Sequence, residues 1–202
     1  MINKYLTILA FTCILVNGLS IFDASPPKPT DHALVARHVL HNCAWGALST
    51  VSTIPSIESY PYTSLESIVD GFDEKGNGVP YFFVTSLDQS IKDIQADNRC
   101  SVMATLAELD WCSKNNLDPE DPRCQRVVLS GTFVWVDNTT QEHTMALENM
   151  FKKHPQFKYW PDIHSFNIAK MEVKQVTLFD WFGGLKLIDL KEYFNANDNN
   201  EV

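Results

Sequence analysis

Residues able to carry out chemistry are few and scattered along this 202-residue chain. The sequence contains no G-x-S-x-G, H-E-x-x-H or Walker pattern, so it offers no nucleophile elbow, zinc-protease helix or nucleotide loop. His32, His38 and His41 fall within ten residues, and the last two lie one helical turn apart, where they could share a metal ion. Helical neighbours of this kind are more typical of partly exposed surface positions. We therefore expect neither a catalytic centre nor a metal site.

The cysteines indicate disulfide chemistry rather than metal binding. Five are present, and Cys13 lies in an apolar N-terminal stretch that we expect to be removed, which leaves four. No C-x-x-C pair occurs, so zinc binding is not expected. Cys112 and Cys124 flank a polar, proline-bearing loop that has little means of holding itself together by packing, and we pair these two. By exclusion Cys43 pairs with Cys100, and the alternative of two separate buried thiols stays open.

The N-terminus has the three-part layout of a cleaved signal peptide. Lys4 is followed by an apolar run over residues 5–16 and then by the small residues Gly18 and Ser20. Such a run rises only ~18 Å as a helix against ~30 Å of bilayer hydrocarbon, too short for a comfortable membrane anchor. We expect residues 1–20 to be removed, with export through the secretory pathway and no membrane insertion. The alternative is a buried N-terminal helix.

The balance of charge argues against nucleic acid as a partner. Lys and Arg number 16 against 25 Asp and Glu, a formal charge of −9, and loss of residues 1–20 with the single charge of Lys4 makes it −10. Phosphate binding depends on clustered basic side chains, which this composition does not favour. The remaining length is sufficient for one domain with a buried core.

The elements that position these residues are predicted to form a single domain of mainly β structure with some α-helix (α+β). Residues 21–30 are expected to form an extended proline-rich leader, 31–194 the domain, and 195–202 a disordered polar tail. β-Branched and aromatic runs predict strands over residues 47–54, 79–85, 102–109, 127–136 and 166–179. Helical spacing predicts helices from Asp31, which can cap the first turn, over 89–96 and over 140–153. Many strands with few helices favour a barrel or sandwich.

Short motifs spread over nearly the whole chain match a known family in order and spacing. They are Ala36-Arg37, Trp45–Thr50, Gly78–Phe82, Met103–Ala107, Leu129–Thr132, His154-Pro155, Trp160-Pro161, His164, Ala169-Lys170, Asp180–Gly184 and Glu192-Tyr193. In these segments the chain resembles the CREG glycoproteins, secreted and lysosomal cellular-repressor proteins. The resemblance implies a six-stranded split β-barrel of the FMN-binding, pyridoxamine-phosphate-oxidase type with peripheral helices. The bridged loop of Cys112 and Cys124 also fits the family pattern, whereas Cys43 and Cys100 lie outside it.

One sequon, Asn138-Thr139-Thr140, lies where a predicted strand gives way to a predicted helix. Its position matches a glycosylation site of the family, and we expect Asn138 to carry a glycan. The alternative is that Asn138 and Thr139 only form the turn and cap the helix. The resemblance further implies a homodimer that does not act as a flavin enzyme, with glycan-dependent sorting to lysosomes or contact with a cell-surface receptor.

The flavin-binding relatives of the split barrel supply the rival hypothesis, an FMN-binding oxidoreductase. In those relatives the segment that corresponds to residues 85–93 carries basic and hydroxyl side chains that hold the cofactor phosphate. Here Ser86, Ser90 and Lys92 could form a vestigial phosphate site, but Asp88 and Asp93 flank the lysine. Like charges ~4 Å apart repel by about 4 kcal/mol at an effective dielectric of ~20, enough to offset one cation. We therefore expect no cofactor, and a non-catalytic glycoprotein that binds a receptor or ligand in growth and differentiation control.

Overall fold

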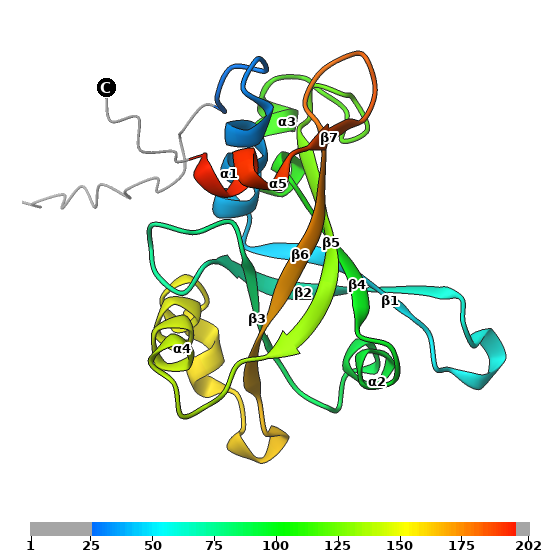
Figure 1. Ribbon diagram of the computed structural model, residues 1–202, viewed down its shortest axis with the longest axis vertical. Helices are drawn as coiled ribbons and strands as arrows, with labels where there is room; N and C mark the ends of the chain where they lie inside the picture. The colour runs from blue at the N-terminus through cyan, green and yellow to red at the C-terminus, as the bar shows by residue number, and fades with distance from the viewer. Residues whose placement is uncertain (1–25, 197–202) are drawn as a thin grey trace, which may run out of the picture.

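The computed structural model describes residues 26–196, which form a closed antiparallel barrel flanked by helices (Figure 1). The strands are β1 (Trp45–Val51), β2 (Pro61–Asp70), β3 (Pro80–Val84), β4 (Arg99–Thr105), β5 (Arg126–Trp135), β6 (Asn167–Phe179) and β7 (Lys186–Ile188). The α-helices are α1 (His32–Asn42), α2 (Gln89–Ala96), α3 (Trp111–Lys114), α4 (Gln141–Lys153) and α5 (Leu190–Asn195). Short 3₁₀ turns are η1 (Pro55–Ile57), η2 (Leu106–Leu109), η3 (Pro155–Tyr159) and η4 (Asp162–His164). The expected signal peptide, residues 1–20, lies outside the described residues.

Six strands close the barrel in the order β3-β2-β1-β4-β5-β6, because β3 also pairs with β6. Tyr81 on β3 lies opposite Lys170 on β6, and every pairing in the barrel is antiparallel. The short strand β7 adds to the free edge of β6. Closure leaves the six main strands with few unpaired edges. The predicted six-stranded barrel with peripheral helices is confirmed.

One row of directly paired side chains runs across five strands and forms the centre of the core. Leu48 pairs with Val102, Val102 with Leu129, Leu129 with Val176, and Val176 with Ile188. All five are buried. Since alternate residues of a strand point to opposite faces, this row fixes the inward face of the strands, and the neighbouring row must face outward.

Helix α1 closes one end of the barrel, beside α5 (Figure 1). Asp31 caps its first turn by accepting a hydrogen bond from the Leu34 amide at 3.1 Å, as the sequence predicted. Val35 and Val39 are fully buried against the barrel core. An apolar stripe at helical spacing, preceded by a capping aspartate, therefore accounts for the formation of α1 and its packing on the end of the barrel.

Helix α4 packs on the outside of the barrel over β2 and β3 and forms a second apolar cluster there (Figure 1). Thr140 caps it by accepting from the His143 amide at 3.2 Å. Glu142 in its first turn accepts hydrogen bonds from the Tyr81 hydroxyl and from the Lys170 ammonium, each at 2.5 Å. These two contacts fasten the helix to the strands that close the barrel.

The structure corrects several predicted boundaries. Strand β2 was not predicted, because the polar residues Thr63, Ser64, Glu66 and Ser67 interrupt its apolar pattern. Its strand conformation comes from pairing with β1 and β3 on both sides. The strand predicted over 102–109 ends at Thr105, where a 3₁₀ turn begins. The leader bends in a turn at residues 29–30, and Asn195, assigned to the tail, is the last residue of α5.

Within residues 26–196, no helix combines the length and the apolar character that a bilayer crossing requires.

Candidate functional site

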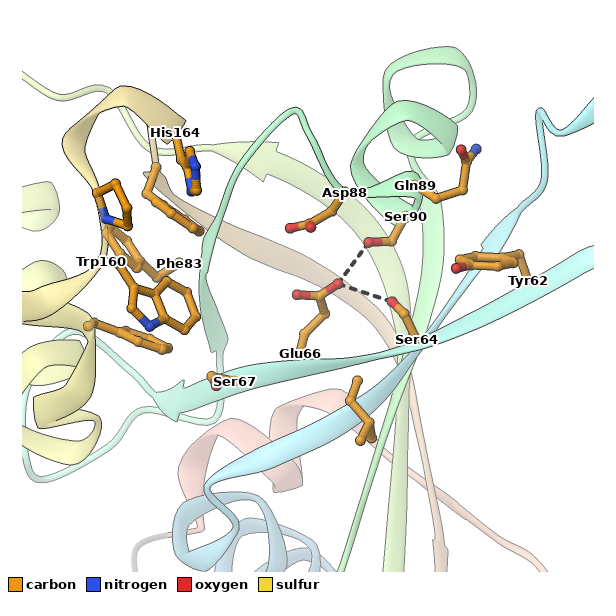
Figure 2. Close-up of a pocket in the computed structure, with 14 residues that line it drawn as sticks. Tyr62, Ser64, Glu66, Ser67, Phe83, Asp88, Gln89, Ser90, Trp160 and His164 are labelled. Atoms are coloured by element: carbon orange, nitrogen blue, oxygen red, sulfur yellow. Dashed lines mark hydrogen bonds between the residues drawn. The ribbon is translucent and has the colours of Figure 1, made fainter.

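A hollow of about 490 Å³ lies between β2, the start of α2 and the segment that carries η3 and η4 (Figure 2). It is lined by Tyr62, Ser64, Leu65, Glu66, Ser67, Phe83, Asp88, Gln89, Ser90, Phe157, Trp160, Pro161, His164 and Phe166. Figure 2 shows polar side chains of β2 and α2 on one side and aromatic side chains of the η3–η4 segment on the other. We call it the β2–α2 pocket.

Glu66 is the central polar group of the β2–α2 pocket. The alternation of β2 places Tyr62, Ser64 and Glu66 on one face of the strand. Glu66 Oε1 accepts hydrogen bonds from the Ser64 hydroxyl at 3.1 Å and from the Ser90 hydroxyl at 2.7 Å. The carboxylate thus joins the strand to the first turn of α2, and its position is fixed from two elements.

The surroundings of Glu66 favour its protonated form. Burial raises the pKa of the Glu66 carboxyl, and the nearby negative charge of Asp88 adds to the rise. The hydroxyl hydrogen bonds from Ser90 and Ser64 act in the opposite direction without cancelling the effect of burial. An opposite charge brought into the pocket would lower the pKa of Glu66 again and favour its ionised form.

The opposite wall is a continuous aromatic cluster. The rings of Phe83 and Phe166 stack with centroids 5.0 Å apart, and Phe83 lies 5.3 Å from Phe157. Trp160 contacts both ends of the group, at 4.2 Å from Phe157 and 4.9 Å from Phe166. Its side chain is 42% exposed, so the indole stands at the mouth of the pocket rather than in the core.

The predicted phosphate-binding residues do not come together. Ser90 lines the β2–α2 pocket but donates its hydroxyl to Glu66, whereas Ser86 and Lys92 are exposed and outside its lining. Asp93, expected to flank Lys92, is buried and accepts instead from the Thr50 hydroxyl at 2.9 Å.

These placements decide how well the pocket fits an anionic cofactor. Its described lining contains two carboxylates and no lysine or arginine. Flavin phosphates are held most strongly by cationic side chains. The two carboxylates of this pocket, with no lysine or arginine beside them, do not fit a flavin phosphate.

The three histidines singled out in the sequence bind separate partners. His32 lies 2.5 Å from the buried carboxylate of Asp180, and His41 lies 3.2 Å from that of Asp70. His38 is within 3.3 Å of the Asn42 side-chain amide. Among the described residues no cluster of three or more His, Cys, Asp or Glu side chains has a geometry that could hold a metal.

The structure confirms one predicted disulfide and contradicts the other. Cys112 and Cys124 are bonded, whereas Cys43 and Cys100 are separate buried thiols. The Cys43 sulfur donates to the Thr105 carbonyl at 3.3 Å, at the end of β4. Cys100 lies five residues earlier on that strand, roughly 17 Å away at ~3.4 Å per residue, and a bridge needs Cα atoms within ~7 Å. The predicted Cys43–Cys100 pair was wrong, and the two-thiol alternative is correct.

Asn138 lies on an exposed turn between β5 and α4, where the sequence predicted it. The turn and the cap are made by its neighbours. Asp137 accepts from the Thr139 amide and hydroxyl, and Thr140 caps α4. The Asn138 side chain is therefore not required for either structure.

Sequence reasoning missed the two residues that define the pocket walls, Glu66 and Trp160. Glu66 belongs to the strand that was not predicted, so its neighbours were unknown. Trp160 was noted only as part of a motif. The signal that could have found Glu66 is the β-branched and aromatic content around it, at Tyr62, Thr63, Ile68 and Val69, which favours a strand.

Comparison with solved structures assigns the chain to the split β-barrel class. The structure of a heme binding protein from Mycobacterium smegmatis superposes with a TM-score of 0.62 at 18% sequence identity, over 86% of this chain and 63% of that one. At this identity the likeness concerns the fold alone, and it confirms the predicted fold class.

Sequence comparison then identifies the family. The family described as "CREG, beta-barrel" matches residues 27–195. Protein CREG1 of Gallus gallus is 34% identical over 193 residues, which cover 95% of this chain and 99% of that protein. Protein CREG1 of Homo sapiens is 37% identical over 173 residues, 85% of this chain and 78% of that protein. The chain belongs to the CREG family, as its motifs predicted.

Proposed function

We propose that this CREG-family chain is a secreted or lysosomal glycoprotein without catalytic activity, which acts by binding a receptor or ligand in growth and differentiation control. The observation that carries the proposal is the family match over residues 27–195. The misfit of the β2–α2 pocket with a flavin phosphate supports the non-catalytic part. A flavin phosphate in this pocket would favour cationic groups, and this pocket has the carboxylates of Glu66 and Asp88 instead.

Export and glycosylation are supported by two features. The Cys112–Cys124 bridge is typical of proteins that mature in an oxidising compartment. The Asn138 turn is exposed, and a glycan there would protrude without disturbing the Thr140 cap. A signal peptide over residues 1–20 would provide the entry to this pathway.

The test is localisation of a tagged full-length chain and of its Asn138→Gln variant. We expect the wild type to gain a mass that glycosidase removes and to reach lysosomes or the medium, and the variant to lose both that mass and the lysosomal signal. Thr139→Ala is the matched control, because it leaves the Asn-X-Thr sequon intact. A cytosolic wild-type chain with no glycan would contradict the proposal.

The rival function, an FMN-dependent oxidoreductase, has a direct test of its own. Purified protein supplemented with FMN is dialysed and its absorbance is measured near the flavin band. We expect no retained flavin. A stoichiometric yellow complex with measurable turnover would establish the rival instead.

We further propose that the protein is a homodimer that buries an outer face of the barrel. Leu65 pairs with Ala47, Ala47 with Met103, and Met103 with Val128, so this outward row is apolar across four strands. Leu65 is 66% exposed in the single chain. Apolar rows of this kind are typical of subunit interfaces.

Sedimentation at micromolar concentration tests the dimer. We expect twice the mass of one glycosylated chain, and we expect Met103→Glu to yield monomer. Trp181→Glu is the control, because Trp181 is exposed but lies in the loop after β6 rather than on this row. A wild-type protein with the mass of one chain would contradict the dimer.

A further inference from the structure

The β2–α2 pocket presents one carboxylate oxygen to whatever enters it. Both hydroxyl hydrogen bonds to Glu66 end on Oε1, and Oε2 accepts none from the described residues. In Figure 2 the carboxylate of Glu66 stands between the serines and the aromatic wall. A donor in the pocket could therefore bind Oε2 without breaking the contacts to Ser64 and Ser90.

The charges around the pocket favour a cation. Glu66 and Asp88 supply two carboxylates, and the described lining contains no lysine or arginine. The start of α2 would by itself attract an anion. Asp88 occupies the N-cap position there, and its side chain makes no capping hydrogen bond. The negative charge of Asp88 therefore disfavours an anion at the N-terminus of α2, where the backbone amides would otherwise attract one.

The aromatic wall completes a site for an organic cation rather than a bare metal ion. Trp160, the best cation–π partner among the side chains, is 42% exposed at the mouth, and the rings of Phe157 and Phe166 lie against it. Aromatic faces attract ammonium groups and stack on flat apolar bodies. The volume of about 490 Å³ lies within the range of pockets for small molecules.

We propose that the β2–α2 pocket binds a small aromatic amine in its protonated form. The ammonium group donates to Glu66 Oε2, and the aromatic body packs on Trp160 and Phe166. The inference goes beyond the proposed function, because it assigns a small ligand to the barrel itself and needs neither the glycan nor a receptor.

Three probes with the same indole ring separate charge from shape: tryptamine (cationic), tryptophol (neutral) and indole-3-propionate (anionic). Titration calorimetry with the purified glycoprotein measures their affinities. We expect tryptamine to bind at least about tenfold more tightly than tryptophol, the gain typical of a hydrogen bond to a charged group, and indole-3-propionate to bind most weakly. Equal affinities, preference for the anion, or no tryptamine binding at ~1 mM would overturn the proposal.

Variants assign the effect to the pocket. Glu66→Gln keeps an amide oxygen for Ser64 and Ser90, and we expect it to lower tryptamine affinity by about tenfold while tryptophol affinity stays unchanged. Glu58→Gln is the matched control, because it removes the same charge from an exposed loop position. Trp160→Ala should weaken both probes, since both stack on the indole.

Amide chemical shifts provide a second readout of the same proposal. Tryptamine should perturb the amides of Ser64 and Ser90 in the wild type. Unchanged tryptamine affinity in Glu66→Gln, or perturbations confined to residues away from β2 and α2, would place the cation elsewhere and refute the proposal.

Discussion

Arg37 on α1 and Asp70 at the end of β2 form an ion pair inside the fold, with Nη2 and Oδ2 3.8 Å apart. Their side chains are only 5% and 1% exposed. The second oxygen of Asp70 accepts from the amides of Asn77 at 3.1 Å and Gly78 at 2.6 Å. One carboxylate therefore ties the helix that closes the barrel to the turn between β2 and β3.

Asp70→Ala should destabilise the protein strongly. It leaves the Arg37 charge buried without its partner and two amides without an acceptor, and loss of one member of a buried pair costs about 3–5 kcal/mol. Urea unfolding measures the difference. Asp97→Ala is the control, since Asp97 pairs with Arg99 on the surface, and we expect a much smaller effect there. Equal effects would show that the buried pair has no special role.

Removal of the Cys112–Cys124 bridge should cost about 3 kcal/mol. The bridge joins residues 12 apart, and closing a loop of this size reduces the entropy of the unfolded chain by roughly that amount. Paired Cys112→Ala and Cys124→Ala substitutions, compared with the oxidised wild type in urea, measure it. A stability unchanged by the pair of substitutions would mean that the loop holds itself in place by packing.

Cys43 and Cys100 should be unreactive in the native protein. Burial raises the pKa of Cys43 well above its usual range and that of Cys100 to about 12, so almost no thiolate is present at pH 8. Iodoacetamide labelling followed by mass spectrometry should find no native labelling, and two labelled thiols per chain without residues 1–20 once urea is added. Absence of labelling in urea would show that Cys43 and Cys100 form a disulfide.

The elements that sequence reasoning found are those whose signals are local. The helices over 89–96 and 140–153 agree with α2 and α4 nearly to the residue, because caps and apolar stripes are encoded within a few positions. Strand β2 was missed because its pairing with β1 and β3 is what makes it a strand.

In the candidate site, too, sequence reasoning found a residue with a local signal and missed a residue that depends on strand pairing. Ser90 was recognised because it lies in the segment that corresponds to the phosphate-binding segment of flavin-binding relatives. Its partner Glu66 lies 24 residues away in sequence and meets it only after β2 joins the barrel. The Cys43–Cys100 prediction failed for a related reason, since an even number of cysteines says nothing about where Cys43, at the end of α1, lies relative to Cys100 on β4.

Gly131→Ala should destabilise the barrel by about 1–3 kcal/mol. Gly131 sits at an irregularity in the pairing of β5 with β6, and a Cβ there would lie 2.1 Å from the Glu172 carbonyl oxygen. That atom belongs to the backbone, so the strands themselves would have to move. Thermal unfolding measures the effect, and Thr132→Ala, which adds no atom at the next position, is the control. A melting temperature equal to that of the control would show that the irregularity adapts freely.

Glu66→Gln should stabilise the protein, and increasingly so as the pH rises. Burial raises the pKa of Glu66, so the folded state holds this proton more tightly than the unfolded state does. Below the ordinary pKa of a glutamate both states are protonated, and the contribution to stability is fully present; it is lost as the pH rises through the folded-state pKa. The other titratable groups that line the pocket with Glu66 are Asp88, Tyr62 and His164.

Urea unfolding of wild type and variant checks this linkage. The measurements run from about pH 3.5, below the ordinary glutamate pKa of about 4.3, to about pH 8. The variant should gain unfolding free energy relative to the wild type as the pH rises from the ordinary glutamate pKa through the raised pKa of Glu66, and the gain should then level off. Glu58→Gln should show no comparable gain over the same pH range. A difference that stays constant with pH would mean that Glu66 titrates normally. A saturating concentration of tryptamine should reduce the stabilising effect of glutamine at neutral pH, because an ammonium beside Glu66 offsets the cost of burying its charge.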